Sequence, residues 1–350
     1  MKPLTDLAIA LAESGAAPDA VVRVGIRRLL AAQLERAGPP GSARRTAARE
    51  ALRERLRNGP IAVHPDAANR QHYEVPAEFF RLFLGPRLKY SSCLWPEGVH
   101  GLAAAEEAML DLTCRRARLA DGMGVLDLGC GWGSLSLWIA ERYPACRVLA
   151  VSNSAGQREH IERECRDRGL AGVEVVTADI NDFDPGRRVD RVISVEMLEH
   201  VRNHERLLER AAGWLEPGGK LFVHVFAHRE LAYLYETDER ESWMARHFFT
   251  GGMMPSEDWL AGYDRDFRLV ERWRVNGRHY ARTLEAWLRQ LDAVRPRARA
   301  LLAEAGEPDP ARQLRRWRIF LMASAELFGY AGGEEWLVSH ALFEPRERAR

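Results

Sequence analysis

The sequence predicts an α/β fold built on a mostly parallel sheet with helices on both of its faces. Five short runs of β-branched and apolar residues alternate with helical segments from about residue 124 onward, which is the pattern of repeated βαβ units. The first run leads into a glycine-rich turn. With 350 residues, 46% of them hydrophobic, the chain can bury a large core. The five runs are GVLDLG (124–129), RVLAVS (147–152), VEVVTAD (173–179), RVDRVISVE (188–196) and KLFVHVFA (220–227).

Residues 1–69 are predicted to form a helical extension ahead of the sheet. Three segments carry apolar residues at three- and four-residue spacing, and turns rich in Gly and Pro separate them. We find no chemical motif here, so the extension could cover a site, form a dimer surface or only pack. The segments are LTDLAIALAES (4–14), AVVRVGIRRLLAAQLERAG (20–38) and SARRTAAREALRERLRNG (42–59).

Residues 70–350 are expected to form the main domain, with the ligand-binding core at 124–230 and a mainly helical cap with closing elements at 231–330. Two late apolar runs are expected to close the sheet edge and to bring the sheet to seven strands, and a long helical stretch separates them. The two runs are RLVERWRVNG (268–277) and EWLVSHALFEP (335–345), and the helical stretch is TLEAWLRQLDAVRPRARALLAEAG (283–306).

Composition argues against several classes of protein. The formal net charge is +1, which favours neither nucleic acid nor an anionic membrane surface. The first residues make a poor signal peptide, and no stretch approaches the roughly 20 apolar residues of a membrane span, so we expect a cytoplasmic protein without stable membrane insertion. The cysteines lack the spacing of a disulfide framework or a metal site; they are Cys93, Cys114, Cys130, Cys146 and Cys165.

The glycine-rich turn reads DLGCGWG and covers residues 127–133. Gly129, Gly131 and Gly133 let the backbone turn tightly and let a ligand approach the main-chain amides. Their spacing differs from the G-x-G-x-x-G dinucleotide fingerprint, and no Gly-Lys-Ser/Thr follows, so hydrolysis of a nucleoside triphosphate is not expected. Asp127 is placed at the strand end, where its carboxylate could hold the ammonium group of a ligand directly or through water.

This turn resembles that of the Rossmann-like, class I S-adenosylmethionine-dependent methyltransferases, and the resemblance implies S-adenosylmethionine as the cofactor. It further implies that Ser152, Asn153 and Gln157, after the second strand, bond the ribose and the amino-acid portion of the cofactor. After the third strand, Asp179 would accept a hydrogen bond from the exocyclic amine of the adenine, and Ile180 would pack on the adenine ring. A plain helix N-cap is the alternative role for Asp179.

The segment QHYEVPAEFFRLFLGPRLKYSSCLW (71–95) resembles the N-terminal signature of the cyclopropane-fatty-acid synthase superfamily. In that branch a Tyr-Ser pair, matched here by Tyr90 and Ser91, covers the cofactor. An aromatic face near a sulfonium also stabilises its charge, and Tyr73 is expected to share that task or to contact the substrate. The alternative is that these aromatic residues belong only to the core.

Members of this superfamily that modify lipids use a bicarbonate ion as a base. The resemblance matches Glu199, His224 and Tyr280 to the residues that bind this ion, whereas Ser92 and Ser324 stand where cysteines are used. The alternative function is therefore a cyclopropane-fatty-acyl-phospholipid synthase or a related lipid methyltransferase. A non-catalytic scaffold that binds the cofactor is a third class, which the complete glycine turn and the ExxEH segment disfavour.

Six motifs, in order, resemble the plant coclaurine N-methyltransferase family. The resemblance implies an N-methyltransferase that acts on a small amine, aromatic or of benzylisoquinoline type. From the charge and the cysteine pattern we expect no nucleic-acid partner and no metal, and a homodimer is possible. The motifs are QHYEVPAEFF (71–80), GCGWGSLSLWIAE (129–141), SVEMLEHVRN (194–203), FFTGGMMPS (248–256), VNGRHYARTLEAWL (275–288) and ELFGYAGGEEWLVSHALF (326–343).

Glu196, Glu199 and His200 follow the fourth strand, at the edge where open α/β sheets bind ligands. Their spacings of three and four would place them on one face of a helix. An alkylamine with a pKa of roughly 10 enters as an ammonium without a lone pair, so some group must bind the cation and take its proton. The resemblance gives that task to Glu199 with His200, and we expect Glu196 to bind or orient the amine. The alternative for Glu196 is mere stabilisation of a helix N-terminus.

Aromatic residues near 248–252 and 317–320 are candidates for a lid over the substrate. Gly251 and Gly252 could let the first of these segments move. Aromatic side chains that line a pocket would stack on the substrate and hold its cation. A place in the core of a helix is the alternative for Trp317 and Phe320. The substrate-binding candidates are Tyr73, His224, Phe249, Tyr280, Trp317 and Phe320.

Overall fold

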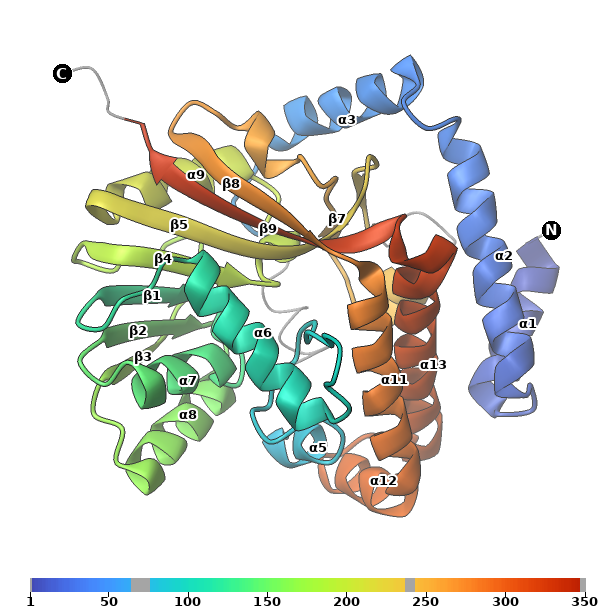
Figure 1. Cartoon of the computed structure of the whole chain (residues 1–350). Coiled ribbons are helices and arrows are strands. Elements are labelled where there is room, and N and C mark those ends of the chain that lie inside the picture. The colour runs from blue at the N-terminus through green and yellow to red at the C-terminus, as the bar shows by residue number, and fades with distance from the viewer. Residues whose placement is uncertain (1, 64–75, 237–242, 347–350) are drawn as a thin grey trace.

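The computed structural model describes residues 2–63, 76–236 and 243–346 (Figure 1). Its strands are β1 (Gly124–Leu128), β2 (Arg147–Ser152), β3 (Val173–Thr177), β4 (Val189–Val195), β5 (Leu215–His228), β6 (Tyr233–Leu234), β7 (Met253–Met254), β8 (Phe267–Val275) and β9 (Trp336–Pro345). Within the described residues, seven of them form one sheet in the order β3-β2-β1-β4-β5-β9-β8. The first five pair in parallel, and β9 is antiparallel to both β5 and β8, so the mostly parallel seven-stranded sheet is confirmed.

The order of the strands reverses between β1 and β4, which lie side by side at the centre of the sheet. Their register pairs Asp127 with Ile193, so the glycine turn after β1 and the acidic segment after β4 begin next to each other. Ligands of open α/β sheets bind outside the carboxyl ends of the strands at such a reversal. The topology therefore fixes where the site must lie.

Helices surround the sheet and continue into a separate helical layer (Figure 1). Several begin at a residue whose side chain accepts a hydrogen bond from the backbone of the first turn, as Asn203, Asn276 and Asp309 do. The α-helices are α1 (Lys2–Ser14), α2 (Asp19–Ala37), α3 (Ala43–Leu56), α5 (Ala77–Arg81), α6 (Leu102–Arg116), α7 (Ser134–Arg142), α8 (Ala155–Arg168), α9 (His204–Gly213), α10 (Trp243–His247), α11 (Gly277–Ala293), α12 (Arg295–Glu304) and α13 (Pro310–Gly329). Short 3₁₀ turns are η2 (Leu198–His200), η3 (Leu260–Gly262) and η4 (Tyr330–Gly333).

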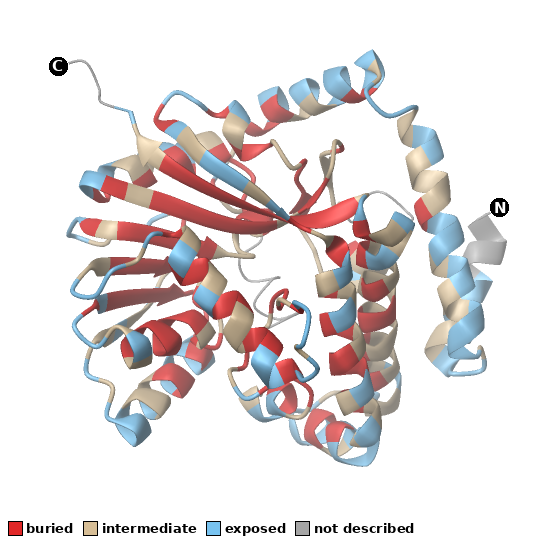
Figure 2. Ribbon diagram, viewed as in Figure 1, coloured by how far each residue is buried: buried red, intermediate tan, exposed pale blue. Residues whose placement is uncertain are grey.

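Side chains of the central strands alternate between two buried layers, as the two-residue period of a strand requires. Ile193 and Phe222 pack with α6 and α7 on one face of the sheet. Val192 and Leu221 pack with α9 on the other. Burial on both faces explains why these strands read as continuous apolar runs, and Figure 2 shows most of the length of the central strands as buried.

The helical cap, formed by α11, α12 and α13, has an aromatic interior. Trp317 of α13 is fully buried and contacts the rings of Phe79, Phe80 and Phe83. Phe83 also packs against Trp287 of α11. Segment 77–83 is thereby fixed between the cap and the core, which holds the following residues 89–95 beside the site.

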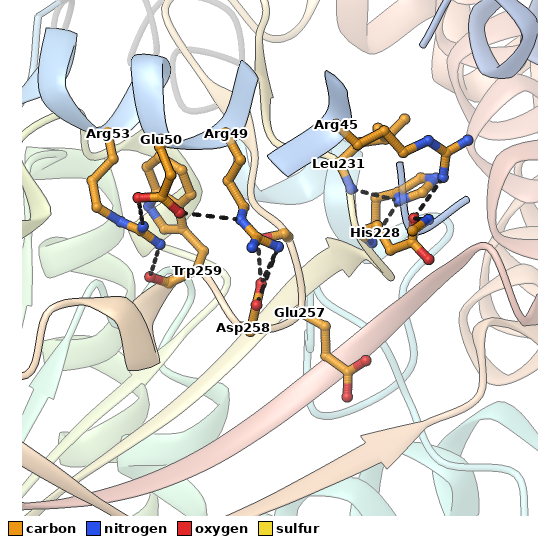
Figure 3. A network of polar contacts seen from close by, with 12 residues as sticks. Arg45, Arg49, Glu50, Arg53, His228, Leu231, Glu257, Asp258 and Trp259 are labelled. Carbon is orange, nitrogen blue, oxygen red and sulfur yellow. Dashed lines mark hydrogen bonds and ion pairs between the residues drawn. The ribbon is translucent and has the colours of Figure 1, made fainter. Parts of the chain in front are cut away.

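The helices of the N-terminal extension bridge the cap and the sheet. α1 and α2 lie along α13, while α3 crosses toward β8 and α9 (Figure 1). Arg23 of α2 pairs with Glu285 and Glu326 of the cap. At the other end, the guanidinium of Arg53 lies 4.9 Å from the centre of the Trp259 ring (Figure 3). The helices expected in this part of the sequence are confirmed, whereas the domain boundaries at 69/70 and 230/231 stay predictions.

None of the helices that the structure describes combines the length and the apolar character needed to cross a membrane.

We predict that Arg53→Ala lowers the free energy of unfolding by about 2 kcal/mol, because Arg53 stacks on Trp259 and Tyr263 with its stem buried. Arg55→Ala is the matched control on the same helix: that side chain is 57% exposed and its ion pair should contribute at most about 1 kcal/mol. Urea denaturation followed by tryptophan fluorescence measures both. An equal decrease in the free energy of unfolding for the two variants would contradict a specific contribution from the stacking of Arg53.

Candidate active site

A pocket opens at the carboxyl ends of β1, β2 and β4, where the topology places it. Most of the residues expected to bind the cofactor line it, and Glu196 and His200 lie at its edge. Lining residues that had no predicted role of their own include Ala62, Met197, Val201 and Thr250; the last three belong to the motifs at 194–203 and 248–256, whereas Ala62 belongs to none. The expected residues that line it are Gly129, Gly131, Ser152, Asn153, Gln157, Asp179 and Ile180.

The glycine turn brings the end of β1 against the segment that follows β4. Gly129 has a φ of +87°, and a Cβ atom there would lie 2.5 Å from Cγ of Met197. Gly133, with a φ of +81°, stands just before α7 and does not line the pocket. A side chain at Gly129 would push the two segments apart, so the turn requires glycine for its conformation and for its neighbour.

Asp127 lies behind the turn rather than in the wall of the pocket. It is 1% exposed, and its carboxylate accepts a hydrogen bond of 2.6 Å from the hydroxyl of Ser136 on α7. Burial raises the pKa of Asp127 to about 6, against the lowering effect of its bonds to Ser136. Its expected contact with the ammonium of a ligand stays a prediction.

Ser152 and Gln157 are held together before any ligand arrives. The Ser152 hydroxyl donates to Oε1 of Gln157 over 2.6 Å. Nε2 of Gln157 is buried in the pocket wall and has no hydrogen-bond partner among the described residues. A buried amide donor without a partner is unfavourable, so it calls for an acceptor from a ligand. This atom suits the polar ribose or amino-acid portion of S-adenosylmethionine.

On the other side of the pocket, Oδ1 of Asp179 accepts from the backbone and side-chain nitrogens of Asn181, at 2.8 and 2.9 Å. Neither Tyr90 nor Ser91 is among the lining residues. Tyr90 packs against Phe80 and Trp287, and Ser91 accepts a hydrogen bond from the buried ammonium of Lys89. Tyr73 lies outside the described residues. The cofactor roles of these residues stay predictions.

The expected helix carrying Glu196, Glu199 and His200 is not formed, so that part of the prediction is wrong. Glu196 has a φ of +47°, in the left-handed region, and its backbone nitrogen still pairs with the carbonyl of His224 on β5. A single 3₁₀ turn, η2, follows with Glu199 and His200. The left-handed backbone conformation of Glu196 therefore directs its side chain independently of those of Glu199 and His200.

The Glu196 carboxylate is held by three donors from distant parts of the chain. Oε1 accepts from the backbone nitrogen of Ser92 at 2.8 Å and from Nε2 of His224 at 3.1 Å. Oε2 accepts from the hydroxyl of Tyr280 at 2.6 Å. Burial raises the pKa of Glu196, while the nearby Lys89 and the hydrogen bonds from Ser92 and Tyr280 oppose the rise.

Glu199 has a different environment although it is three residues away. It is fully buried, Oε1 accepts from the backbone nitrogen of Phe226 at 2.7 Å, and Oε2 has no partner among the described residues. Burial and then the charge of Glu196 raise the pKa of Glu199 well above its ordinary value. Two interacting buried carboxyl groups do not both ionise readily, so Glu196, with more donors, carries the charge and Glu199 the proton.

A row of aromatic rings connects His200 to Tyr280, and we call it the aromatic wall: Phe249, Phe226, Phe328 and Tyr280. Phe249 lies 4.7 Å from the His200 ring and 5.7 Å from Phe226. Phe328 contacts Phe226 at 6.0 Å and stacks on Tyr280 at 4.4 Å. The wall therefore runs past both carboxyl groups.

Two members of this wall, Phe226 and Phe328, were not predicted from the sequence. Phe226 follows His224 by two residues on β5, so the strand period could have placed both on one face. Phe328 belongs to the ELFGY motif, where nothing local indicates its direction. Trp317 and Phe320 both contact Phe248 in the interior of the cap, and their expected contact with the substrate stays a prediction.

Comparison with known proteins matches residues 63–332 to the mycolic acid cyclopropane synthetase family. The (S)-coclaurine N-methyltransferase of Thalictrum flavum subsp. glaucum is 38% identical over 301 residues, covering 84% of this chain and 83% of the relative. That of Papaver somniferum is 35% identical over 295 residues, covering 83% and 84%. The cyclopropane-fatty-acyl-phospholipid synthase of Escherichia coli (strain K12) is 30% identical and covers 65% of this chain and 57% of the relative.

A solved coclaurine N-methyltransferase, bound to N-methylheliamine and SAH, is 37% identical and superposes with a TM-score of 0.93, covering 98% of this chain and 99% of the other. A mycolic acid cyclopropane synthase complexed with SAH and CTAB reaches 0.67 at 25% identity, covering 80% and 98%. The fold is that of a class I S-adenosylmethionine-dependent methyltransferase. The chain belongs to the mycolic acid cyclopropane synthetase family, in the branch of the coclaurine N-methyltransferases.

Proposed function

We propose that this N-methyltransferase acts on a small aromatic amine, of benzylisoquinoline type or similar in size, which enters the site as an ammonium. The observation that carries the proposal is the pair of buried carboxyl groups, Glu196 and Glu199, beside the aromatic wall. Carboxylate attracts the cation, and aromatic faces favour both the ring and the charge of the amine. The N-methylheliamine in the solved relative is an amine of this kind and supports the assignment.

S-adenosylmethionine, when bound, supplies a methyl group activated by a sulfonium. We propose that Gln157, with Ser152 and Asn153, holds its polar portion, and that Asp179 and Ile180 hold the adenine. The partnerless donor of Gln157 is the feature that fits such a ligand. The pocket reaches Glu196 and His200, so an amine bound there stands next to the cofactor site.

The two carboxyl groups have different roles toward the amine. Glu196, held as an anion, attracts the ammonium and fixes its nitrogen. Glu199 holds a proton before the amine binds; the charge of the bound ammonium favours its ionised form, so Glu199 releases this proton through His200 toward water and can then accept the proton of the amine. The raised pKa of Glu199 brings it closer to that of the amine, so this transfer is less uphill. His200 lines the pocket and passes the proton on toward water. The nitrogen then has the lone pair that methyl transfer requires.

The environment of Glu196 disfavours the lipid alternative. His224 and Tyr280, two residues that the resemblance matches to a bicarbonate site, are already bonded to the Glu196 carboxylate. A second anion beside that carboxylate would be repelled.

We expect labelled methyl groups to pass from the cofactor to benzyltetrahydroisoquinoline amines, and none to vesicles of unsaturated phospholipid. Label in the lipid extract and in no amine of the panel would reject the proposal.

A homodimer and a cytoplasmic location remain proposals from the sequence. Size-exclusion chromatography with light scattering measures the first. A monomeric mass at micromolar concentration would exclude a stable dimer.

Glu199→Gln should lower kcat for the amine by about two to four decades, because the base is lost while the shape of the side chain is kept. Calorimetric affinity for S-adenosylmethionine should stay within about threefold of wild type. Glu106→Gln is the matched control: this carboxyl group is also fully buried, with its pKa raised to about 7, but binds backbone nitrogens of Arg87 and Lys89. Equal loss of kcat in both variants would make Glu199 structural.

Asp127→Asn should stabilise the fold at neutral pH. Between roughly pH 4 and pH 6 the folded protein holds a proton on Asp127 that the unfolded chain has released, so stability is lost as the pH rises through this window. The variant should gain about 2 to 3 kcal/mol at pH 7 and almost nothing at pH 4.

Urea titrations across pH 4–8 measure this gain, and a difference independent of pH would contradict it. The affinity of Asp127→Asn for S-adenosylmethionine should fall about tenfold or more if the carboxylate holds the ligand's ammonium.

A further inference from the structure

Two buried histidines face each other beside the Glu196 carboxylate. His224 of β5 and His340 of β9 are partners in the antiparallel pairing of these strands, and both are 0% exposed. Their ring centres are 4.5 Å apart. His224 was expected to bind substrate, but its Nε2 is engaged by Glu196, and His340 has no part in the chemistry proposed above.

The proton of His224 can be assigned from its partner. An ionised carboxylate only accepts hydrogen bonds, so Nε2 of His224 must donate to Glu196. Burial lowers the pKa of His224 well below its ordinary value, so the ring is neutral and carries one proton. Nδ1 is consequently an acceptor. It is buried and has no partner among the described residues.

The proton of His340 can be assigned from the opposite side. A guanidinium only donates, so Nδ1 of His340 accepts from Arg116 of α6, at 2.8 Å. Burial lowers the pKa of Arg116 to about 10, which leaves it charged at neutral pH, and burial also keeps His340 neutral by lowering its pKa. The single proton of His340 is therefore on Nε2, a buried donor without a partner in the described part of the chain.

We propose that Nε2 of His340 donates to Nδ1 of His224, directly or through one water molecule, and completes a chain of hydrogen bonds from Arg116 to Glu196. The two partnerless atoms are one donor and one acceptor on adjacent rings whose centres are 4.5 Å apart, so a rotation of the rings or one bridging water molecule would let each satisfy the other. Every bond then points the same way, from a cation to an anion, and bonds aligned in this way strengthen one another.

In this chain of hydrogen bonds His340 and Arg116 are positioning residues that act through His224 on Glu196. They favour the ionised form of Glu196, because protonation of that carboxylate removes the acceptor at the end of the chain. The inference rests on the proposed function only in its kinetic consequence, the binding of an ammonium by Glu196. The charged and titratable groups that interact with the two rings, or with Arg116 and Glu196 at the ends of the hydrogen-bond chain, are Lys89, Arg115, Arg116, Glu196, Glu199, Glu271 and Tyr280.

The first test does not depend on activity. Long-range ¹⁵N–¹H NMR spectra of protein labelled in histidine report the tautomer of each ring. We expect His224 and His340 both to carry the proton on Nε2, and His340→Leu to move the Nδ1 resonance of His224 toward that of a nitrogen without a hydrogen bond. A proton on Nδ1 of either ring, or an unmoved His224 resonance in the variant, would overturn the chain.

The second test is the pH dependence of kcat/KM for an amine that the enzyme methylates. His340→Leu should shift the acidic limb upward by about one pH unit, because Glu196 is then protonated more easily. His340→Gln keeps a donor at similar reach and should restore part of the shift. Leu342→Ala, two residues along β9 and fully buried, is the control for lost stability and should leave the limb in place.

The two failures can be told apart. If the acidic limb of kcat/KM in His340→Leu lies at the wild-type pH and methylation is normal, the role of the hydrogen-bond chain is overturned, whereas the proposed function is not affected. Absence of methylation with any amine would instead reject the proposed function, and the NMR result alone would then decide whether the chain exists.

Discussion

The rest of the site depends on one buried carboxylate that has been given enough hydrogen-bond donors to remain charged. An ion without partners in a protein interior is strongly disfavoured. Glu196 receives its donors from Ser92, His224 and Tyr280, which belong to the segment before α6, to β5 and to α11. The carboxylate can therefore exist in this form only when cap, sheet and connecting segment are all in place.

The supply of hydrogen-bond donors also gives Glu196 and Glu199, two chemically identical side chains, different protonation states. Glu196 is the strained residue at the end of β4 and Glu199 belongs to the short 3₁₀ turn that follows, and the fold gives the first several donors and the second one. Their mutual repulsion then assigns the charge to one and the proton to the other. A difference in reactivity thus arises from the placement of backbone amides and rings around equal groups.

The position of Glu196 is the physical basis of our proposal that the substrate is an amine rather than a lipid. A carboxylate built into the chain occupies donors that a dissociable anion would otherwise need, and it cannot leave. The aromatic wall provides the complementary surface, because Phe226, Phe328 and Tyr280 contact one another through ring faces and edges. The ion pairs of Arg23 with Glu285 and Glu326 join α2 to the two cap helices, α11 and α13, that carry Tyr280 and Phe328.

The sequence by itself determined the α/β class, the seven strands, the glycine turn and the order of the motifs, since apolar period and turn chemistry are local properties. It also placed Asp179, Gln157 and Glu196 near one sheet edge, because residues after parallel strands meet there. Tertiary structure alone decided that Glu196 is not on a helix, that Asp127 faces Ser136, and that Phe226 and Phe328 join the wall. These features depend on contacts between segments far apart in the chain, which local patterns do not encode.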